Sequence, residues 1–183
     1  DIPFCVAGGI RSVDDARRVL HAGADKISIN TPALENPQLI SDLARVFGTQ
    51  CVVVGVDSQI VDGDLFCWKY TGKTSTARSA GKKTVDWVSE AQDRGAGEVV
   101  LNCMGRDGTR SGYDIEQLSQ VRQRLHIPLV ASGGAGSVAH FVEVFKEARV
   151  DAALAAGIFH RREVEIRDLK RRLRQAAIEV RDE

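Results

Sequence analysis

The sequence has no excess of charge of either sign, because 25 lysines and arginines are balanced by 25 aspartates and glutamates. A protein that binds nucleic acid or anionic membranes nonspecifically needs a basic surplus, so the balance argues against both partners and leaves room only for a local phosphate-binding cluster. Long apolar runs are also missing, and no stretch approaches the length of a membrane span. The start at Asp1 shows no charged leader or cleavage site, and we therefore expect a cytoplasmic protein.

Cysteine and histidine are few, and neither is arranged for metal binding. The four cysteines are Cys5, Cys51, Cys67 and Cys103, and they form no CxxC motif and no Cys/His ligand spacing. Three of them lie in strand-like runs, so we expect buried, reduced thiols. The four histidines do not converge on a catalytic triad or a metal site. The sequence therefore predicts no metal and no other cofactor.

What the sequence does contain is an internal repeat. Residues 3–31, PFCVAGGIRSVDDARRVLHAGADKISINT, match residues 128–157, PLVASGGAGSVAHFVEVFKEARVDAALAAG. Most pairs fall at one constant offset, and Asp25 matches Asp151 after a slip of one residue. A repeat of this length indicates a duplicated structural unit and restricts the architecture.

Short runs rich in valine and isoleucine alternate with amphipathic stretches, which is typical of a parallel sheet with crossover helices. We expect six strands, at Phe4–Ala7, Lys26–Asn30, Cys51–Asp57, Glu98–Cys103, Leu129–Ser132 and Ala152–Ala155. Helices are predicted to begin near Ser12, Asn36, Thr84, Asp114, Ser137 and Glu163. An insert follows the third strand; its Asp62-Gly63 turn predicts a hairpin, and its tail over residues 71–83 predicts a mobile flap.

Six such units fit either an open doubly wound sheet or most of an eight-unit barrel, and the duplication favours the barrel. We therefore predict an α/β fold, an incomplete TIM (βα)8 barrel whose six units correspond to units 3–8. Residues 1–183 form one partial barrel domain: residues 1–50 hold units 3 and 4, and residues 51–183 hold the complete second half-barrel. Units 1 and 2 are absent from these residues. The outer strands would be unpaired edges, so we expect a homo-oligomer formed through them.

Glycine pairs follow a strand and open a helix in both copies of the repeat. Such glycines let the backbone approach an anion while the first helical N–H groups point at it, although a tight turn is the alternative for each pair. Two cradles facing each other across a barrel mouth imply a ligand phosphorylated at both ends. The candidate residues are Gly8, Gly9, Asn30 and Thr31 in the first cradle and Gly133, Gly134, Ala156 and Gly157 in the second, which Gly108 and Thr109 would extend.

Asp57 ends the otherwise apolar strand CVVVGVD. It is therefore expected at the carboxyl ends of the strands, where the active sites of such barrels lie. A carboxylate in that position is a candidate general acid or base, while a helix cap or an ordinary solvated strand end explains it equally well. Arg106 and Arg110 follow the next strand and are predicted to be solvated. Trp68, Tyr70 and Trp87 surround the hairpin and are predicted to be packing residues, because no basic residues interleave with them as in a single-strand binder.

Several segments together resemble one family over essentially the whole chain: GGIRSVDDARRVLHAGADKISINT, VDSQIVDG, RDGTRSGYD, ASGGAG and DAALAAGIFH. They are similar to the cyclase (HisF) subunit of imidazole glycerol phosphate synthase. The related histidine-pathway sugar isomerase shares some glycines and is a weaker alternative. The resemblance implies a (βα)8 lyase of histidine biosynthesis. Ammonia from a glutaminase subunit joins a bisphosphorylated ribulosyl aminoimidazole nucleotide and yields imidazole glycerol phosphate and an aminoimidazole carboxamide ribotide.

The resemblance also implies roles for individual residues. Asp57 matches one of the family's two catalytic aspartates; Gly9, Asn30 and Thr31 match one phosphate site, and Gly108, Gly134, Ala156 and Gly157 match the other. Lys26 and Glu98 match half of the charged ring through which ammonia enters.

Some of the family's positions differ here or have no counterpart. Gly105 stands where the family usually has an acidic residue, and Gly157 replaces a serine. The other catalytic aspartate lies on the family's first strand, which has no counterpart in these 183 residues. Two alternatives stay open: a cyclase that is inactive or weak alone and needs a complementing segment, or a self-assembling phosphate-binding scaffold without turnover.

Overall fold

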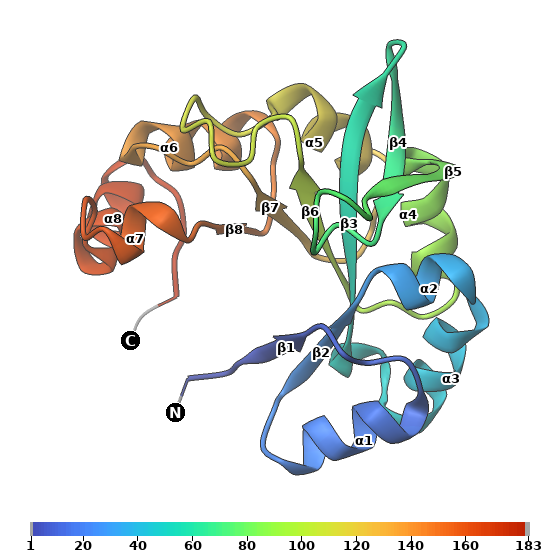
Figure 1. Cartoon of the computed structure of the whole chain (residues 1–183). Coiled ribbons are helices and arrows are strands. Elements are labelled where there is room, and N and C mark those ends of the chain that lie inside the picture. Colours follow the sequence, from blue (N-terminus) through green and yellow to red (C-terminus); the bar gives the residue numbers. More distant parts are fainter. Residues whose placement is uncertain (1, 182–183) are drawn as a thin grey trace.

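The computed structural model describes residues 2–181 and arranges them around one curled sheet (Figure 1). Six strands form the path β1-β2-β3-β6-β7-β8, and every pairing along it is parallel. Their bounds are β1 Cys5–Ala7, β2 Lys26–Ile29, β3 Val52–Val61, β6 Glu98–Cys103, β7 Leu129–Ser132 and β8 Ala152–Leu154. The predicted α/β fold with an incomplete TIM barrel is confirmed.

Helices cover the convex side of this sheet (Figure 1). They are α1 Val13–His21, α2 Thr31–Glu35, α3 Gln38–Phe47, α4 Thr84–Asp93, α5 Ile115–Arg122, α6 Val138–Glu147, α7 Gly157–His160 and α8 Ile166–Gln175, with a 3-10 turn at Thr49–Cys51. Ser12 caps α1 as predicted, because its hydroxyl accepts a hydrogen bond of 3.1 Å from the backbone N–H of Asp15. The short helices α2 and α7 were not predicted, and both follow a strand almost directly.

The predicted hairpin makes the third strand longer than the sequence predicted. Strand β3 runs past Asp57 and pairs antiparallel with β4 (Asp64–Lys69), which pairs in turn with β5 (Arg78–Lys83). Asp62 and Gly63 both have positive φ, at 51° and 84°, as a tight hairpin turn requires. The prediction that Asp57 ends its strand is therefore wrong. Residues 78–83 of the predicted flap form β5, which leaves residues 70–77 as the connection between β4 and β5.

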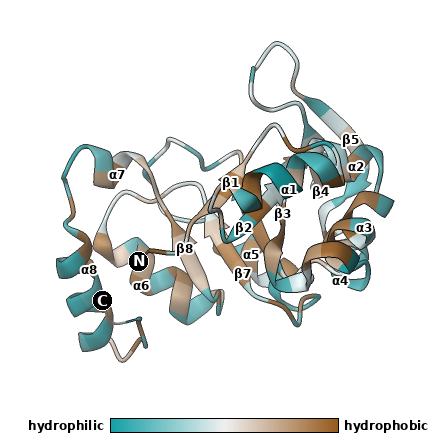
Figure 2. Cartoon of the chain, turned by 90° about the horizontal axis from the view of Figure 1, so that it is seen from below, coloured by the Kyte–Doolittle hydropathy of each residue, from teal (hydrophilic) through white to brown (hydrophobic). Residues whose placement is uncertain are grey.

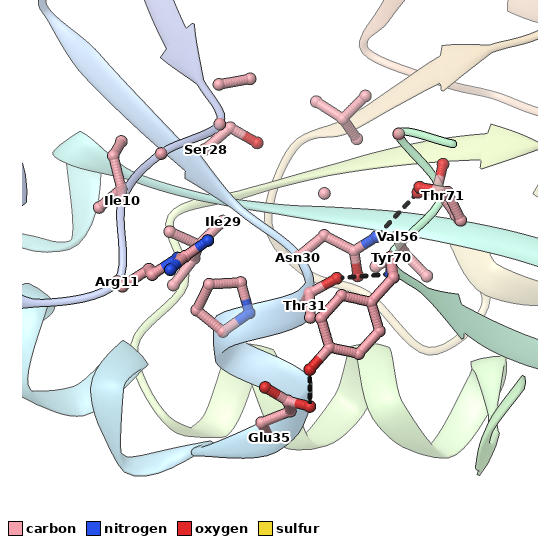
Figure 3. Close-up of a pocket in the computed structure, with 18 of the residues that line it drawn as sticks. Ile10, Arg11, Ser28, Ile29, Asn30, Thr31, Glu35, Val56, Tyr70 and Thr71 are labelled. Carbon is pink, nitrogen blue, oxygen red and sulfur yellow. Dashed lines mark hydrogen bonds between the residues drawn. The ribbon is translucent and has the colours of Figure 1, made fainter. Parts of the chain in front are cut away.

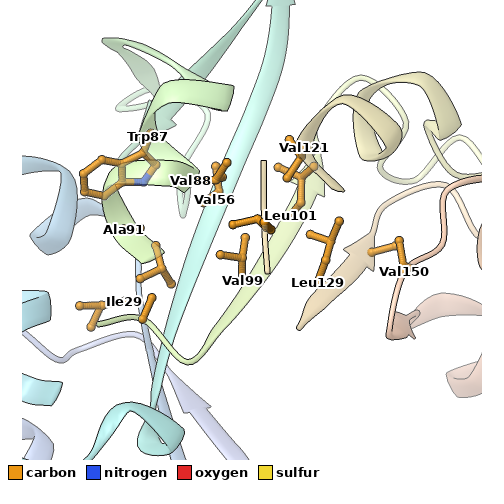
Figure 4. Close-up of a cluster of buried hydrophobic side chains, with 14 of the residues drawn as sticks. Ile29, Val56, Trp87, Val88, Ala91, Val99, Leu101, Val121, Leu129 and Val150 are labelled. Atoms are coloured by element: carbon orange, nitrogen blue, oxygen red, sulfur yellow. The ribbon is translucent and has the colours of Figure 1, made fainter. Parts of the chain in front are cut away.

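The apolar core lies between the sheet and the helices. Figure 4 shows Val88 of α4 beside Val56 on the sheet. Both side chains are buried, as are Leu101 on the sheet and Trp87 on α4. Figure 2 shows both apolar and polar residues along α6 and α8, as expected for helices that turn one face to the sheet. The prediction that Trp87 is a packing residue is confirmed.

The sequence repeat is also a repeat of hydrogen bonds. The Asp25 carboxylate accepts from the N–H of Phe4 at 2.8 Å, and the Asp151 carboxylate accepts from the N–H of Leu129 at 2.8 Å. Each aspartate therefore connects the start of the strand that follows it to the start of the neighbouring strand: β2 to β1 for Asp25, and β8 to β7 for Asp151. The match between Asp25 and Asp151, seen first as a spacing, has the same structural cause in both copies.

Within the described residues, β1 pairs only with β2 and β8 only with β7, so both are edge strands as predicted. Phe4 and Leu154 beside or on these strands are 51% and 47% exposed.

The prediction that all four cysteines are buried is wrong for Cys5, which is exposed because it lies on the edge strand β1. By contrast Cys67 and Cys103 are buried, and burial raises the pKa of the Cys67 thiol to about 12.

Candidate active site

Asp57 lies in a cage of hydrogen-bond donors. Its Oδ1 accepts from the Asn102 amide at 2.8 Å, and its Oδ2 accepts from the Asn30 amide at 2.8 Å and from the Thr71 hydroxyl at 2.5 Å. Asn30 follows β2 and Asn102 lies on β6, the two strands that flank β3. Asp57 is therefore neither a helix cap nor a solvated strand end. Its carboxylate is fixed from both sides by the sheet.

The same amides leave two acceptors without a partner. Asn30 Oδ1 and Asn102 Oδ1 are both buried and accept no hydrogen bond within the described part of the chain. Buried polar atoms in proteins are nearly always satisfied, so unpaired acceptors beside a carboxylate favour a ligand that brings N–H or O–H donors. The surroundings of Asp57 thus suit a ligand rich in donors.

The first predicted cradle and Asp57 share one pocket of about 940 Å³ (Figure 3). Gly8 and Gly9 line it with φ of 91° and 76°, and nothing stands within 4 Å of a Cβ built on either. Asn30 and Thr31 complete this wall. The volume is in the range of small-molecule sites, and the open glycine backbone allows a ligand to approach closely.

The second predicted cradle lies at the ends of β7 and β8 and does not line that pocket. Gly133 and Gly134 also have positive φ, but a Cβ on Gly134 would stand 2.1 Å from the carbonyl oxygen of Gly112. The loop after β6 is therefore packed against this glycine pair. The structure brings Asp57 together with the first cradle and keeps the second, with Ala156 and Gly157, apart from it.

An arginine side chain lies against the second cradle. A Cβ on Gly157 would stand 2.9 Å from Arg161 Nη1, while Arg161 Nε donates to Glu163 at 2.6 Å. Arg110 is exposed, as predicted, and it also pairs with the same carboxylate. These contacts hold the pKa of Glu163 below its usual range, chiefly through the Arg161 hydrogen bond. Glu163 thus ties the loop after β6 to the segment after α7.

Gly108 and Thr109 stand exposed on the loop after β6. The Thr109 hydroxyl donates to the carbonyl oxygen of Arg106 at 2.7 Å, and it lies 2.8 Å from the Ser111 hydroxyl. This hydroxyl is therefore engaged by its own loop, and a phosphate role for Gly108 and Thr109 stays a prediction.

Lys26 and Glu98 lie at the opposite edge of the sheet, at the starts of β2 and β6. Lys26 Nζ and Glu98 Oε2 are 2.5 Å apart, so the two predicted ring residues form an ion pair that spans the intervening strand β3. The curled sheet thus brings together two residues that lie 72 positions apart in the sequence.

Three residues of the site were missed or misread from the sequence. Asn102 is a polar residue in the buried run EVVLNC, a signal comparable to that of Asp57. Thr71 left no signal, because it sits in a segment rich in small polar residues. Tyr70 was predicted to pack, but it is 37% exposed and lines the pocket.

Two further classes of site are not found among residues 2–181. No group of three or more histidine, cysteine, aspartate or glutamate side chains is placed to hold a metal ion. None of the described helices is both long and apolar enough to cross a membrane.

A curled parallel sheet with a caged carboxylate and an open glycine pair at its carboxyl edge defines a protein of the (βα)-barrel class. The model of a family described as histidine biosynthesis protein matches residues 1–165. The chain belongs to this family, and its relatives place it among the cyclase (HisF) subunits of imidazole glycerol phosphate synthase.

Curated relatives match the chain along its length. "Imidazole glycerol phosphate synthase subunit HisF" of Xanthomonas campestris pv. campestris (strain B100) is 61% identical over 183 residues, covering 100% of this chain and 71% of the relative. The protein of that name from Xanthomonas axonopodis pv. citri (strain 306) is 60% identical over the same shares. "Imidazole glycerol phosphate synthase subunit hisF1" of Vibrio vulnificus (strain YJ016) is 55% identical, covering 99% of this chain and 71% of the relative. All three carry the cyclase's name and not that of the isomerase.

Proposed function

We propose that this chain carries part of the machinery of the cyclase reaction, in which ammonia and a bisphosphorylated ribulosyl aminoimidazole nucleotide give imidazole glycerol phosphate and an aminoimidazole carboxamide ribotide. The observation that carries the proposal is the position of Asp57, a caged carboxylate in the same pocket as the open Gly8-Gly9 turn. Asp57 acts there as a general acid or base on the substrate, while the amides of Asn30 and Asn102 hold it in place.

The phosphate groups of the substrate are bound at the two cradles, one in the pocket with Asp57 and the other outside it, at the ends of β7 and β8. The first binds at Gly9 and Thr31, where backbone N–H groups and a hydroxyl are open to the pocket. The second binds at Gly134 and Gly157, where the Arg161 guanidinium occupies the space that a serine side chain would take. Arginine is well suited to phosphate because its planar fork donates two hydrogen bonds at once.

A partner glutaminase is the second part of the proposal. The curated relatives are named as subunits of a synthase, which implies assembly with another subunit. We place that subunit at the amino edge of the sheet, where the Lys26–Glu98 ion pair lies and where ammonia would enter. The cytoplasmic location predicted from the sequence stays a prediction.

The test is a complementation assay for turnover. The 183-residue chain is mixed with an amino-terminal fragment of a relative that supplies the first two βα units and the other catalytic aspartate. We expect ammonia-dependent formation of imidazole glycerol phosphate by the mixture and little by either component. A mixture that stays inactive although the two components associate would contradict the proposal.

A second candidate function, a self-assembling scaffold, is favoured by the exposed edges of β1 and β8. Two copies related by a twofold axis along the barrel would place β8 of each beside β1 of the other, and both seams would remain parallel. Light scattering at micromolar concentration is then expected to give a dimer, and Leu154→Lys at the β8 edge should shift it toward monomer without loss of helix signal. A wild-type chain that is monomeric in this range would overturn the dimer.

A further inference from the structure

Tyr70 lies at the start of the connection between β4 and β5, and it ties that connection to α2, the helix that follows β2. Its backbone is left-handed, with φ of 59°, and its N–H donates to Thr31 Oγ1 at 2.9 Å. Its phenol donates to Glu35 Oε1 at 2.5 Å, at the far end of α2 (Figure 3). The side chain and the backbone of one strained residue thus grip both ends of α2. A non-glycine residue at positive φ persists only where its surroundings determine it.

Cationic groups surround this contact. Lys69 Nζ lies 3.2 Å from Glu35 Oε1, and the Arg78 guanidinium lies 4.6 Å from the centroid of the Tyr70 ring. The positive charge of Arg11, which lines the same pocket, acts on the phenol as well and favours its ionised form. The hydrogen bond from Tyr70, followed by Lys69, holds the pKa of Glu35 below its usual range, and the same bond raises the pKa of Tyr70. Near neutral pH the contact therefore joins a neutral phenol and a carboxylate.

The next residue, Thr71, carries this anchoring to the active site. Its hydroxyl donates to Asp57 Oδ2, the oxygen that also accepts from Asn30. The other two donors to Asp57 come from the sheet, whereas Thr71 comes from the connection between β4 and β5. Its hydroxyl reaches Asp57 only while that connection stays docked.

We propose that Thr71 is a positioning residue for Asp57, and that the Tyr70–Glu35 latch holds it in place. The latch also orders the first cradle: Thr31 Oγ1 accepts from Tyr70, which leaves the Thr31 hydroxyl hydrogen free to donate to a phosphate oxygen. Two adjacent residues, Tyr70 and Thr71, therefore position both the first cradle and Asp57. The part concerning turnover rests on the proposed function, and the latch itself does not.

The latch is tested first without any activity measurement. The chain has two tyrosines, and burial raises the pKa of the other, Tyr113, whose hydroxyl donates to the carbonyl oxygen of Leu154. The first absorbance change at 295 nm on raising the pH therefore reports Tyr70. Glu35→Gln should lower its midpoint toward the ordinary tyrosine value of about 10, because the carboxylate that stabilised the protonated phenol is gone. Glu147→Gln, on the exposed end of α6, is the control. An unchanged midpoint in Glu35→Gln would overturn the latch.

The sign of the pH effect follows from both partners. As the pH rises through the raised pKa of Tyr70, the phenolate repels the Glu35 carboxylate and the latch opens. As the pH falls through the lowered pKa of Glu35, the carboxylate is protonated and its stabilising contribution, present above the unfolded pKa, is lost. Between these limits the latch is closed.

The positioning role is tested with Thr71→Val and Thr71→Ser. In the complemented enzyme Thr71→Val should lower kcat about tenfold with little change in KM, the effect of one lost hydrogen bond to a charged group, and Thr71→Ser should restore it. The side-chain carboxyl 13C resonance of Asp57, assigned from Asp57→Asn, should also move in Thr71→Val and not in Thr71→Ser. That resonance needs no turnover, so it tests Thr71 even where the proposed function fails. A resonance unmoved in Thr71→Val would overturn the proposal.

Discussion

Asp57→Asn is expected to lower the turnover of the complemented enzyme by about 10²- to 10⁴-fold, the usual contribution of a general acid or base. Asparagine has nearly the same shape as aspartate, but it cannot exchange a proton at working pH. Asparagine keeps one oxygen to accept from Asn30 and Thr71, and its NH2 group can donate to the unpaired Asn102 Oδ1 once that amide turns over, so the fold and the pocket should persist. Initial rates with saturating ammonium salt give the measurement, and circular dichroism verifies folding.

Asp62→Asn is the matched control for this substitution. Asp62 is exposed in the hairpin turn that follows strand β3, and asparagine tolerates its left-handed φ of 51°. Turnover of Asp62→Asn should equal that of the parent chain. If Asp57→Asn retained parent-like turnover beside this control, Asp57 would have no catalytic role.

Trp87→Ala is expected to have the largest effect on stability, lowering the free energy of unfolding by about 3–5 kcal/mol. Trp87 is fully buried on α4, and the Lys82 ammonium lies 4.5 Å from its ring centroid. Its indole nitrogen has no hydrogen-bond partner among the described residues, so Trp87→Phe removes an unsatisfied donor and keeps most of the ring volume. Phenylalanine should therefore cost much less than alanine.

Urea unfolding followed by far-ultraviolet circular dichroism measures both Trp87 variants, because fluorescence changes with the substitution itself. The midpoint should fall in the order parent, Trp87→Phe, Trp87→Ala. Equal midpoints for all three would contradict a core centred on α4 and β3.

The fold could be predicted because its signals are local. Valine-rich runs fix the six parallel strands, and the repeat fixes their order, down to the matched hydrogen bonds of Asp25 and Asp151. Boundaries failed where tertiary pairing extended an element. Strand β3 continues to Val61 because the hairpin supplies it with an antiparallel neighbour. The Asp62-Gly63 turn predicted the hairpin, but not that its first strand is continuous with the strand that holds Asp57.

The site could be predicted only in part, because its parts are far apart in sequence. Asp57 and the Gly8-Gly9 turn carry strong local signals, and the structure places them in one pocket. Thr71 contacts Asp57 only because β4 runs back along β3 and ends beside it. Arg110 contacts Glu163, which lies 53 residues further along the chain. Contacts of this kind depend on how loops pack, and composition favours solvent exposure for each of these side chains.

Calorimetric titration of the 183-residue chain with the bisphosphorylated ribulosyl aminoimidazole nucleotide is the sharpest test of a nucleotide site at Asp57 and the first cradle, since binding requires no complementing segment. We expect one nucleotide per chain, competition by inorganic phosphate, and weaker binding by Thr31→Val, which removes the hydroxyl of the first cradle and retains the shape of the residue. The absence of saturable binding, or binding unchanged in Thr31→Val and unaffected by phosphate, would contradict it.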